Sequence, residues 1–192
     1  IHSPEFAPLL KKAGELRESN LPLWDKVNEL SNTIREKILP KRDYHDPEYR
    51  ALLSETLSKK QDVPLSKYVC IGAGVCRENA FLLHLLLKEA RIPNKFVYAQ
   101  VQVIEDGIKH AEDHAFTIVN YQNELWIADS YDGWFHGYKF SDVMSQNGIG
   151  PESDALPTAM RPSVRRKILK LNNYPKVWIP KSKRCMGFFR NL

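Results

Sequence analysis

The sequence predicts an α+β fold in which N-terminal helices and a central, cysteine-bearing helix pack on an antiparallel sheet. Residues 1–92 carry apolar residues at helical spacing, and residues 95–140 have the composition of strands separated by short turns. The length of 192 residues and the hydrophobic content of 43% suit one globular domain with a full core. Helical and extended patterns therefore follow one another along the chain, which is typical of this class.

The first three predicted helices each begin at or near a proline. They cover residues 4–17, 22–39 and 46–57, and proline is favourable in a first helical turn because its missing N–H has no partner there. The second helix has an apolar stripe at steps of three and four residues, formed by Val27, Leu30, Ile34 and Ile38. This stripe predicts a helix face buried in the core.

The middle of the chain is predicted to contain one buried helix. Residues 62–67 have loop composition, and residues 68–71 form a short apolar run that leads into Gly72 and Gly74, where the backbone can turn sharply. Residues 76–90 then contain no Gly or Pro and are rich in Leu. They predict a single helix with few exposed positions.

Cys76 stands at the start of this helix. Unpaired backbone N–H groups and the positive end of the helix dipole favour a thiolate at such a position. The sequence thus makes Cys76 a candidate nucleophile. The alternative is that Cys76 is a small core residue, since free cysteine is among the most buried residue types.

Strands follow the central helix. Residues 95–104 have strand composition and lead into a turn at residues 105–107. Residues 115–119 and 125–128 form the next two predicted strands, and residues 134–140 a further one. We expect these segments to form an antiparallel sheet.

The loop between the second and third strands predicts a register. If Tyr121 and Gln122 form the loop, Phe116 faces Ile127 and His114 faces Asp129. The shared face is then apolar in its middle and carries a histidine beside an aspartate at its open end.

Cys76, His114 and Asp129 together have the composition of a thiol acyl-transfer site. A thiolate attacks an acyl carbon, an imidazole moves the proton, and a carboxylate orients the imidazole. Backbone N–H groups near Cys76 are natural donors to an oxyanion. Other histidines are weaker candidates for the base: His84, His110 and His136. No side-chain oxyanion donor is singled out among Trp24, Trp126, Trp134 and Asn79.

The cysteine pattern predicts neither disulfides nor a metal cluster. Cys70, Cys76 and Cys185 are odd in number and lack the paired spacing of a zinc site. We therefore expect no metal, no cofactor and a reducing, cytoplasmic compartment, and we consider a Cys70–Cys76 disulfide unfavoured. No apolar run reaches membrane-spanning length.

Positive charge is concentrated in a C-terminal extension, residues 141–192. Residues 161–192 contain ten Lys or Arg and no Asp or Glu, whereas the preceding residues carry 18 Lys or Arg against 23 Asp or Glu. Residues 163–171 are predicted as a basic helix and residues 176–179 as a last strand. The charge suits docking on an acidic partner, and the absence of an alternating aromatic and basic motif disfavours nucleic acid.

Two segments resemble the core of the transglutaminase-like superfamily: GVCRENAFLLHLLLKEARIPNKFVYAQV and DHAFTIVNYQNELWIADSYDG. They contain a Gly-x-Cys that opens a helix, a His-Ala-aromatic motif and a Trp-x-x-Asp motif. The resemblance covers residues 27–138 and implies a papain-like core within a catalytic domain of residues 1–140. It implies Cys76 as nucleophile, His114 as base and Asp129 as its orienter. Arg91 and Phe116 depart from the family pattern, which usually has Gly and Trp there.

The resemblance implies a protein or peptide substrate and one of several reactions. These are glutamine transamidation or deamidation and peptide hydrolysis, and bacterial effectors secreted into a host cytosol also resemble the superfamily. Arylamine N-acetyltransferases share the order Cys, His, Asp and are an alternative, although Gly72-Ala73-Gly74 lacks the arginine of their glycine motif. A non-catalytic module that docks through the basic extension is a further alternative.

Overall fold

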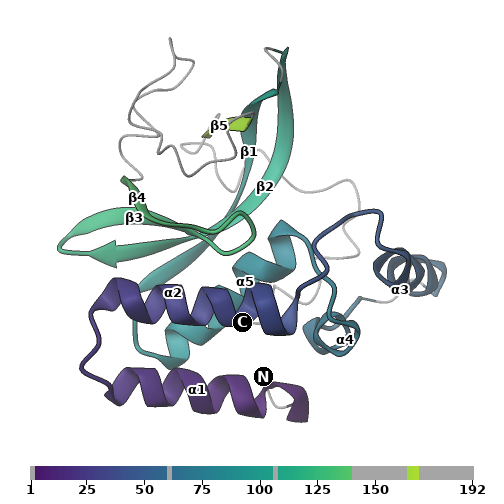
Figure 1. Ribbon diagram of the computed structural model, residues 1–192. Coiled ribbons are helices and arrows are strands. Elements are labelled where there is room, and N and C mark those ends of the chain that lie inside the picture. Colours follow the sequence, from purple (N-terminus) through teal and green to yellow (C-terminus); the bar gives the residue numbers. More distant parts are fainter. Residues whose placement is uncertain (1–2, 60–61, 106–107, 140–163, 169–192) are drawn as a thin grey trace.

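The computed structural model describes residues 3–59, 62–105, 108–139 and 164–168, and it has the predicted α+β class. Helices lie on one side of the molecule and an antiparallel sheet on the other (Figure 1). The main core fills the space between these two layers, with residues from α1, α2, α5 and the sheet. None of the described helices is long and apolar enough to cross a lipid bilayer.

The N-terminal helices agree with the sequence prediction. A 3-10 turn η1 (Pro4–Phe6) leads into α1 (Ala7–Glu18), and α2 (Leu23–Thr33) continues into a π-helical turn η2 (Ile34–Ile38). The helix α3 spans Pro47–Ser58. The predicted stripe of α2 and η2 is buried at three of its four positions: Val27, Leu30 and Ile34.

One segment predicted as a loop and an apolar run is a helix. Residues Leu65–Ile71 form α4, so the loop prediction for residues 62–67 is wrong from Leu65 onward. Leu65 and Tyr68 are buried in the main core. Gly72, with a φ of +65°, takes the left-handed conformation and ends this helix.

The central helix α5 spans Cys76–Glu89, as predicted. Its first turn is capped by Glu78, whose carboxylate accepts the Val75 backbone N–H at 3.0 Å. Its other end leads through Ala90 to Arg91, which has a φ of +56°. A positive φ is uncommon for a residue with a side chain, and glycine adopts it at no steric cost.

Within the described residues, the sheet has five strands in the order β4-β3-β2-β1-β5. The strands are β1 (Asn94–Glu105), β2 (Ile108–Tyr121), β3 (Glu124–Asp129), β4 (Trp134–Lys139) and β5 (Val164–Ile168). All neighbouring pairs are antiparallel.

The fifth strand corrects a prediction. Residues 163–171 were expected to form a basic helix, yet Val164–Ile168 pairs with β1, with Val101 opposite Ile168. Part of the basic extension therefore belongs to the sheet. The other elements predicted in the extension, including the strand at residues 176–179, lie outside the described residues, as does most of the turn at residues 105–107.

The register of the β2–β3 hairpin also differs from the prediction. Tyr121 pairs with Glu124 and Ile118 with Ile127, so the loop is Gln122-Asn123 rather than Tyr121-Gln122. Both loop residues have positive φ values, 53° and 63°, as a two-residue type I′ turn requires. Each residue of β3 therefore pairs with a residue two positions further along β2 than predicted; Ile127, for example, pairs with Ile118 and not with Phe116. Because a shift of two residues does not reverse the faces of a strand, every side chain keeps its predicted face.

Candidate active site

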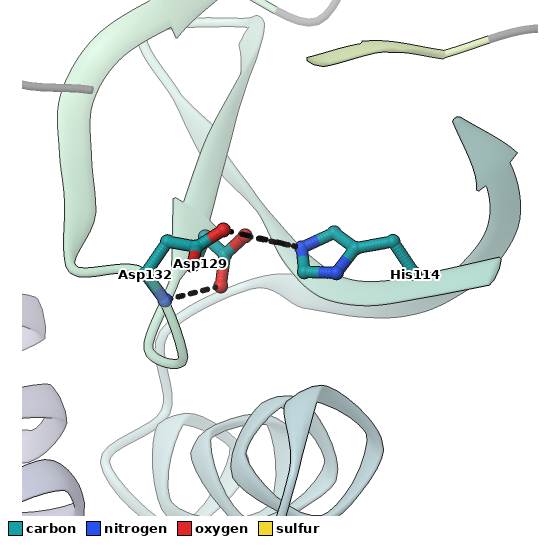
Figure 2. A group of neighbouring side chains, drawn as sticks. All are labelled: His114, Asp129 and Asp132. Carbon is teal, nitrogen blue, oxygen red and sulfur yellow. Dashed lines mark hydrogen bonds and ion pairs between the residues drawn. The ribbon is translucent and has the colours of Figure 1, made fainter. Parts of the chain in front are cut away.

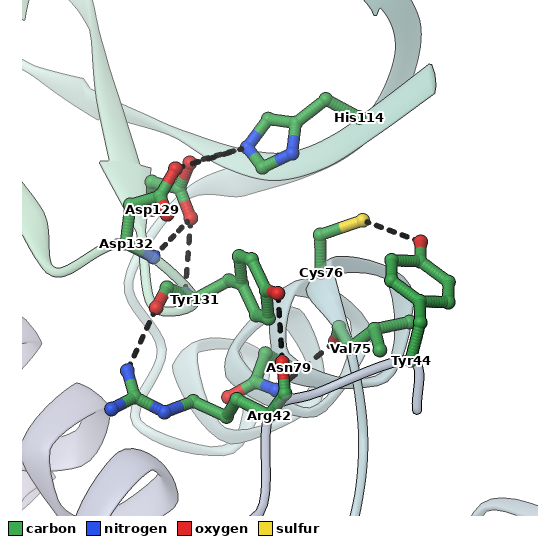
Figure 3. Close-up of polar contacts among 9 residues, drawn as sticks. All are labelled: Arg42, Tyr44, Val75, Cys76, Asn79, His114, Asp129, Tyr131 and Asp132. Carbon is green, nitrogen blue, oxygen red and sulfur yellow. Dashed lines mark hydrogen bonds and ion pairs between the residues drawn. The ribbon is translucent and has the colours of Figure 1, made fainter. Parts of the chain in front are cut away.

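Cys76 is the first residue of α5 and lies where the helix meets the sheet (Figure 3). It packs with Ala80 on the same helix and Ala115 on β2, and these small side chains allow the helix to approach the strand closely. Thr117 of β2 fixes this contact, because its hydroxyl donates to the Ala80 carbonyl at 2.9 Å. Cys76 is a free thiol and is 3% exposed.

His114 and Asp129 are joined across the hairpin, as the sequence predicts. His114 Nε2 lies 2.5 Å from Asp129 Oδ2, and both side chains are buried. His114 and Asp129 are diagonal neighbours and do not lie directly opposite each other. In the observed register, Asp129 lies two residues away from the position opposite His114. A diagonal neighbour on the same face remains within reach of a histidine side chain.

Asp129 is held by the turn that follows β3. Its Oδ1 accepts the backbone N–H groups of Tyr131 and Asp132, at 3.0 and 3.2 Å (Figures 2 and 3). The other oxygen, Oδ2, is thereby presented to His114. The turn thus fixes the carboxylate that orients the imidazole.

The imidazole of His114 lies beside the sulfur of Cys76 (Figure 3). Burial on its own lowers the pKa of His114, but the charge and hydrogen bond of Asp129, followed by the effect of Cys76, raise this pKa to about 10. Since Nε2 is bound to Asp129, Nδ1 is the nitrogen left for the thiol. The three side chains of the predicted triad are therefore brought together in one place.

Arg35 supplies positive charge to the acidic turn. Burial lowers the pKa of its guanidinium, while Asp129 and Asp132 act in the opposite direction. The guanidinium packs directly against Gly133, where an added Cβ would lie 1.6 Å from Arg35 Nη1. The guanidinium of Arg35, which belongs to η2, therefore lies near the two carboxylates of the turn.

Tyr44 is a site residue that the sequence analysis missed. Its hydroxyl lies 3.8 Å from Cys76 Sγ, although Tyr44 is 32 residues earlier in the chain. It stands in the segment between η2 and α3, and it is 54% exposed. No local sequence signal marks it, because only the tertiary packing brings this segment to the thiol.

The segment that carries Tyr44 is tied to the turn after β3. Arg42 Nη1 donates to the Tyr131 carbonyl at 2.9 Å, and the Tyr131 hydroxyl donates to the Arg42 carbonyl at 2.8 Å (Figure 3). These reciprocal hydrogen bonds connect the two loops that flank the site.

Other sequence candidates take structural positions. Asn79 donates its amide to the carbonyls of Gly74 and Val75, at 2.9 and 3.0 Å, so it shapes the turn before Cys76. His84 binds Asn94, with Nδ1 2.6 Å from Oδ1. Two tryptophans pack edge to face in the main core: Trp24 and Trp126. The side chains of His110, Trp134 and His136 lie outside the described part of the structure.

One group of side chains has the composition of a metal site. Ligand atoms of His114, Asp129 and Asp132 lie within 4.8 Å of one another (Figure 2). A nitrogen and two carboxylates suit a divalent transition metal. The guanidinium of Arg35 opposes this use, because its positive charge already interacts with both carboxylates.

Comparison with known proteins finds no matching family model and no matching curated protein. The geometry of the described residues is therefore the basis for assigning a function.

Proposed function

We propose that this chain is a transglutaminase-like cysteine acyltransferase or hydrolase that forms a thioester between Cys76 and an acyl group of a protein amide. The observation that carries the proposal is that His114 binds Asp129 through one ring nitrogen and lies beside Cys76, the first residue of α5 (Figure 3). That arrangement is the one required of a general base in nucleophilic thiol catalysis.

The first half-reaction acylates the thiol. The Cys76 sulfur attacks the amide carbon, a C–S bond forms, and the carbonyl oxygen becomes an oxyanion. Protonated His114 then donates its proton to the leaving nitrogen as the C–N bond breaks. The amine or ammonia departs, and a neutral imidazole and the thioester remain.

The second half-reaction regenerates the thiol. Water or a primary amine attacks the thioester carbon, and His114 accepts a proton from this nucleophile. The C–S bond then breaks and the sulfur leaves, so the imidazolium and thiolate are restored. Water gives deamidation or peptide hydrolysis, and an amine gives transamidation.

The raised pKa of His114 supports this sequence of steps. With a pKa of about 10, the imidazole is protonated at neutral pH and can stand beside a thiolate as its counter-ion. We also propose a papain-like core, since a helix that begins at the nucleophile packs on the strands that carry the base and its orienter.

A test of nucleophilicity uses iodoacetamide at neutral pH. Cys70 is exposed and Cys76 is buried, so accessibility alone predicts that Cys70 is alkylated first. The proposal predicts the opposite order, read by peptide mass spectrometry, because a thiolate reacts much faster than a thiol. Alkylation of Cys70 ahead of Cys76 would contradict it.

The reaction itself is tested with casein as acyl donor, with and without a primary amine. We expect incorporation of amine, replacement of a side-chain amide by acid, or chain cleavage, each identified by mass. The matched controls are Cys76→Ser, which should abolish the product, and Cys70→Ser, which should retain it. Full activity of the enzyme after treatment with EDTA is expected as well, whereas a metal at His114, Asp129 and Asp132 predicts a loss.

A further inference from the structure

We propose that the hydroxyl of Tyr44 is the side-chain donor of the oxyanion hole, which hydrogen-bonds the acyl oxygen while that oxygen carries negative charge. The inference rests on the proposed thioester chemistry and adds a catalytic residue to it. The sequence predicts backbone N–H groups for this role and singles out no side-chain donor.

The distance between Tyr44 and Cys76 fits the role. The Tyr44 oxygen is 3.8 Å from Sγ. In the tetrahedral adduct the oxyanion is two bonds from the sulfur, and an oxyanion donor lies about 2.7 to 3.1 Å from that oxygen. A donor at the observed position can therefore reach the oxyanion with little movement.

The direction of approach fits as well. His114 reaches Cys76 from the buried face of β2, whereas Tyr44 reaches it from the exposed segment between η2 and α3 (Figure 3). The base and the oxyanion donor must address different atoms of the acyl group, namely the leaving nitrogen and the carbonyl oxygen. Donors on different sides of the sulfur meet this requirement.

Tyr44 is held in place although it is exposed. On one side of it, the Lys41 backbone pairs with the turn before Cys76, since Lys41 N donates to the Gly72 carbonyl at 3.1 Å and Gly74 N donates to the Lys41 carbonyl at 2.9 Å. On the other side, its ring packs edge to face on Tyr49, 6.2 Å between centroids. Preorganisation of this kind is what gives an oxyanion donor its effect.

Tyr44 remains a donor throughout the working pH range. Although 54% of the residue is exposed, partial desolvation of the hydroxyl, followed by the charge and hydrogen bond of Cys76, raises the pKa of this hydroxyl well above the ordinary value. Asn79, a second polar side chain near Cys76, has its amide committed to the Gly74 and Val75 carbonyls.

The test compares two reactions of Cys76 in the full chain. Acylation by p-nitrophenyl acetate passes through a tetrahedral oxyanion, whereas alkylation by iodoacetamide does not. For Tyr44→Phe we expect acylation to slow by about 10²-fold, the typical effect of one oxyanion donor. We expect little change in alkylation. Tyr98→Phe is the matched control, because Tyr98 also packs beside Cys76, and it should leave both rates close to wild type.

Three results would overturn the assignment. Faster acylation and alkylation in Tyr44→Phe would make Tyr44 a cover over the thiol. An equal loss in both reactions, with unchanged circular dichroism, would make it a support for the thiolate. Unchanged rates would deny it any role. The proposed function fails separately, if Cys76→Ser hydrolyses the ester as fast as the wild type.

Discussion

Cys76 is approached by two side chains from very different surroundings. His114 is 3% exposed, stands on a central strand and is fixed by Asp129, which a turn holds in place. Tyr44 is 54% exposed and stands on a connecting segment. The position of His114 is fixed by the sheet, and the position of Tyr44 is fixed by contacts between loops.

This difference separates two tasks. Proton transfer requires an imidazole that gives up and regains a proton, and Asp129 and Cys76 both act on the pKa of the buried His114 ring. Stabilisation of an oxyanion needs a hydrogen-bond donor at a place that the acyl group of the substrate can reach. We infer that the sheet side of the site carries the acid–base chemistry and that the loop side admits the acyl group.

The strongest test of this division is His114→Ala. Removal of the base should lower amide turnover by about 10⁶-fold, since the nucleophile and base act as a unit. Steady-state kinetics of amine incorporation measure the effect. The loss should exceed that of Tyr44→Phe by a large factor, and equal losses in the two variants would contradict the division.

Asp129→Asn is expected to have the next largest effect, about 10⁴-fold on turnover, because the imidazole loses the group that orients it. The pKa of His114 should fall, since burial lowers it and the opposing carboxylate charge is gone. Amide turnover needs protonated His114 at the leaving nitrogen. The alkaline limb of the pH–rate profile should therefore move to lower pH, and an unmoved limb would show that Asp129 does not set this pKa.

The same interaction predicts a pH dependence of stability. The pKa of His114 is raised on folding from an ordinary value of 6.5 to about 10. Its stabilising contribution is thus fully present below the unfolded pKa and is lost as pH rises through the folded one. Urea denaturation at pH 6.5 and pH 10 should show a loss on the order of a few kcal/mol in the wild type relative to His114→Gln. Parallel pH profiles of the two proteins would count against the raised pKa.

The buried side of the site was largely predictable and the exposed side was not. Alternation of polar and apolar residues fixes the face on which His114 and Asp129 lie, because any even shift of register preserves that face. The loop residues of the hairpin were misplaced by one, since Gln122 adopts a positive φ that its side chain does not favour.

The missed features depend on distant partners. Val164–Ile168 is a strand because β1 offers it an edge, which local charge and propensity do not reveal. Leu65 and Tyr68 belong to a helix that is buried by the main core. Tyr44 lies beside Cys76 because the segment before α3 is hydrogen-bonded to the turn at Gly72.

Gly133→Ala probes the support behind Asp129 and is expected to have the smallest effect. Gly133 and Gly72 both have positive φ values, 83° and 65°, so alanine at either should cost about 1 kcal/mol in backbone strain. Only at Gly133 does the new Cβ meet a guanidinium, 1.6 Å from Arg35 Nη1, whereas the nearest atom at Gly72 is 3.7 Å away.

Gly133→Ala should therefore displace Arg35 from the two carboxylates and lose about 1 kcal/mol more than Gly72→Ala in urea denaturation. In an Arg35→Ala background this excess should disappear, since the clash has no partner, and the double-mutant cycle measures the difference. An excess that persists without Arg35 would mean that the backbone of the turn, rather than the arginine, sets the requirement for glycine. The position of Asp129 would then depend on the turn after β3 and not on Arg35.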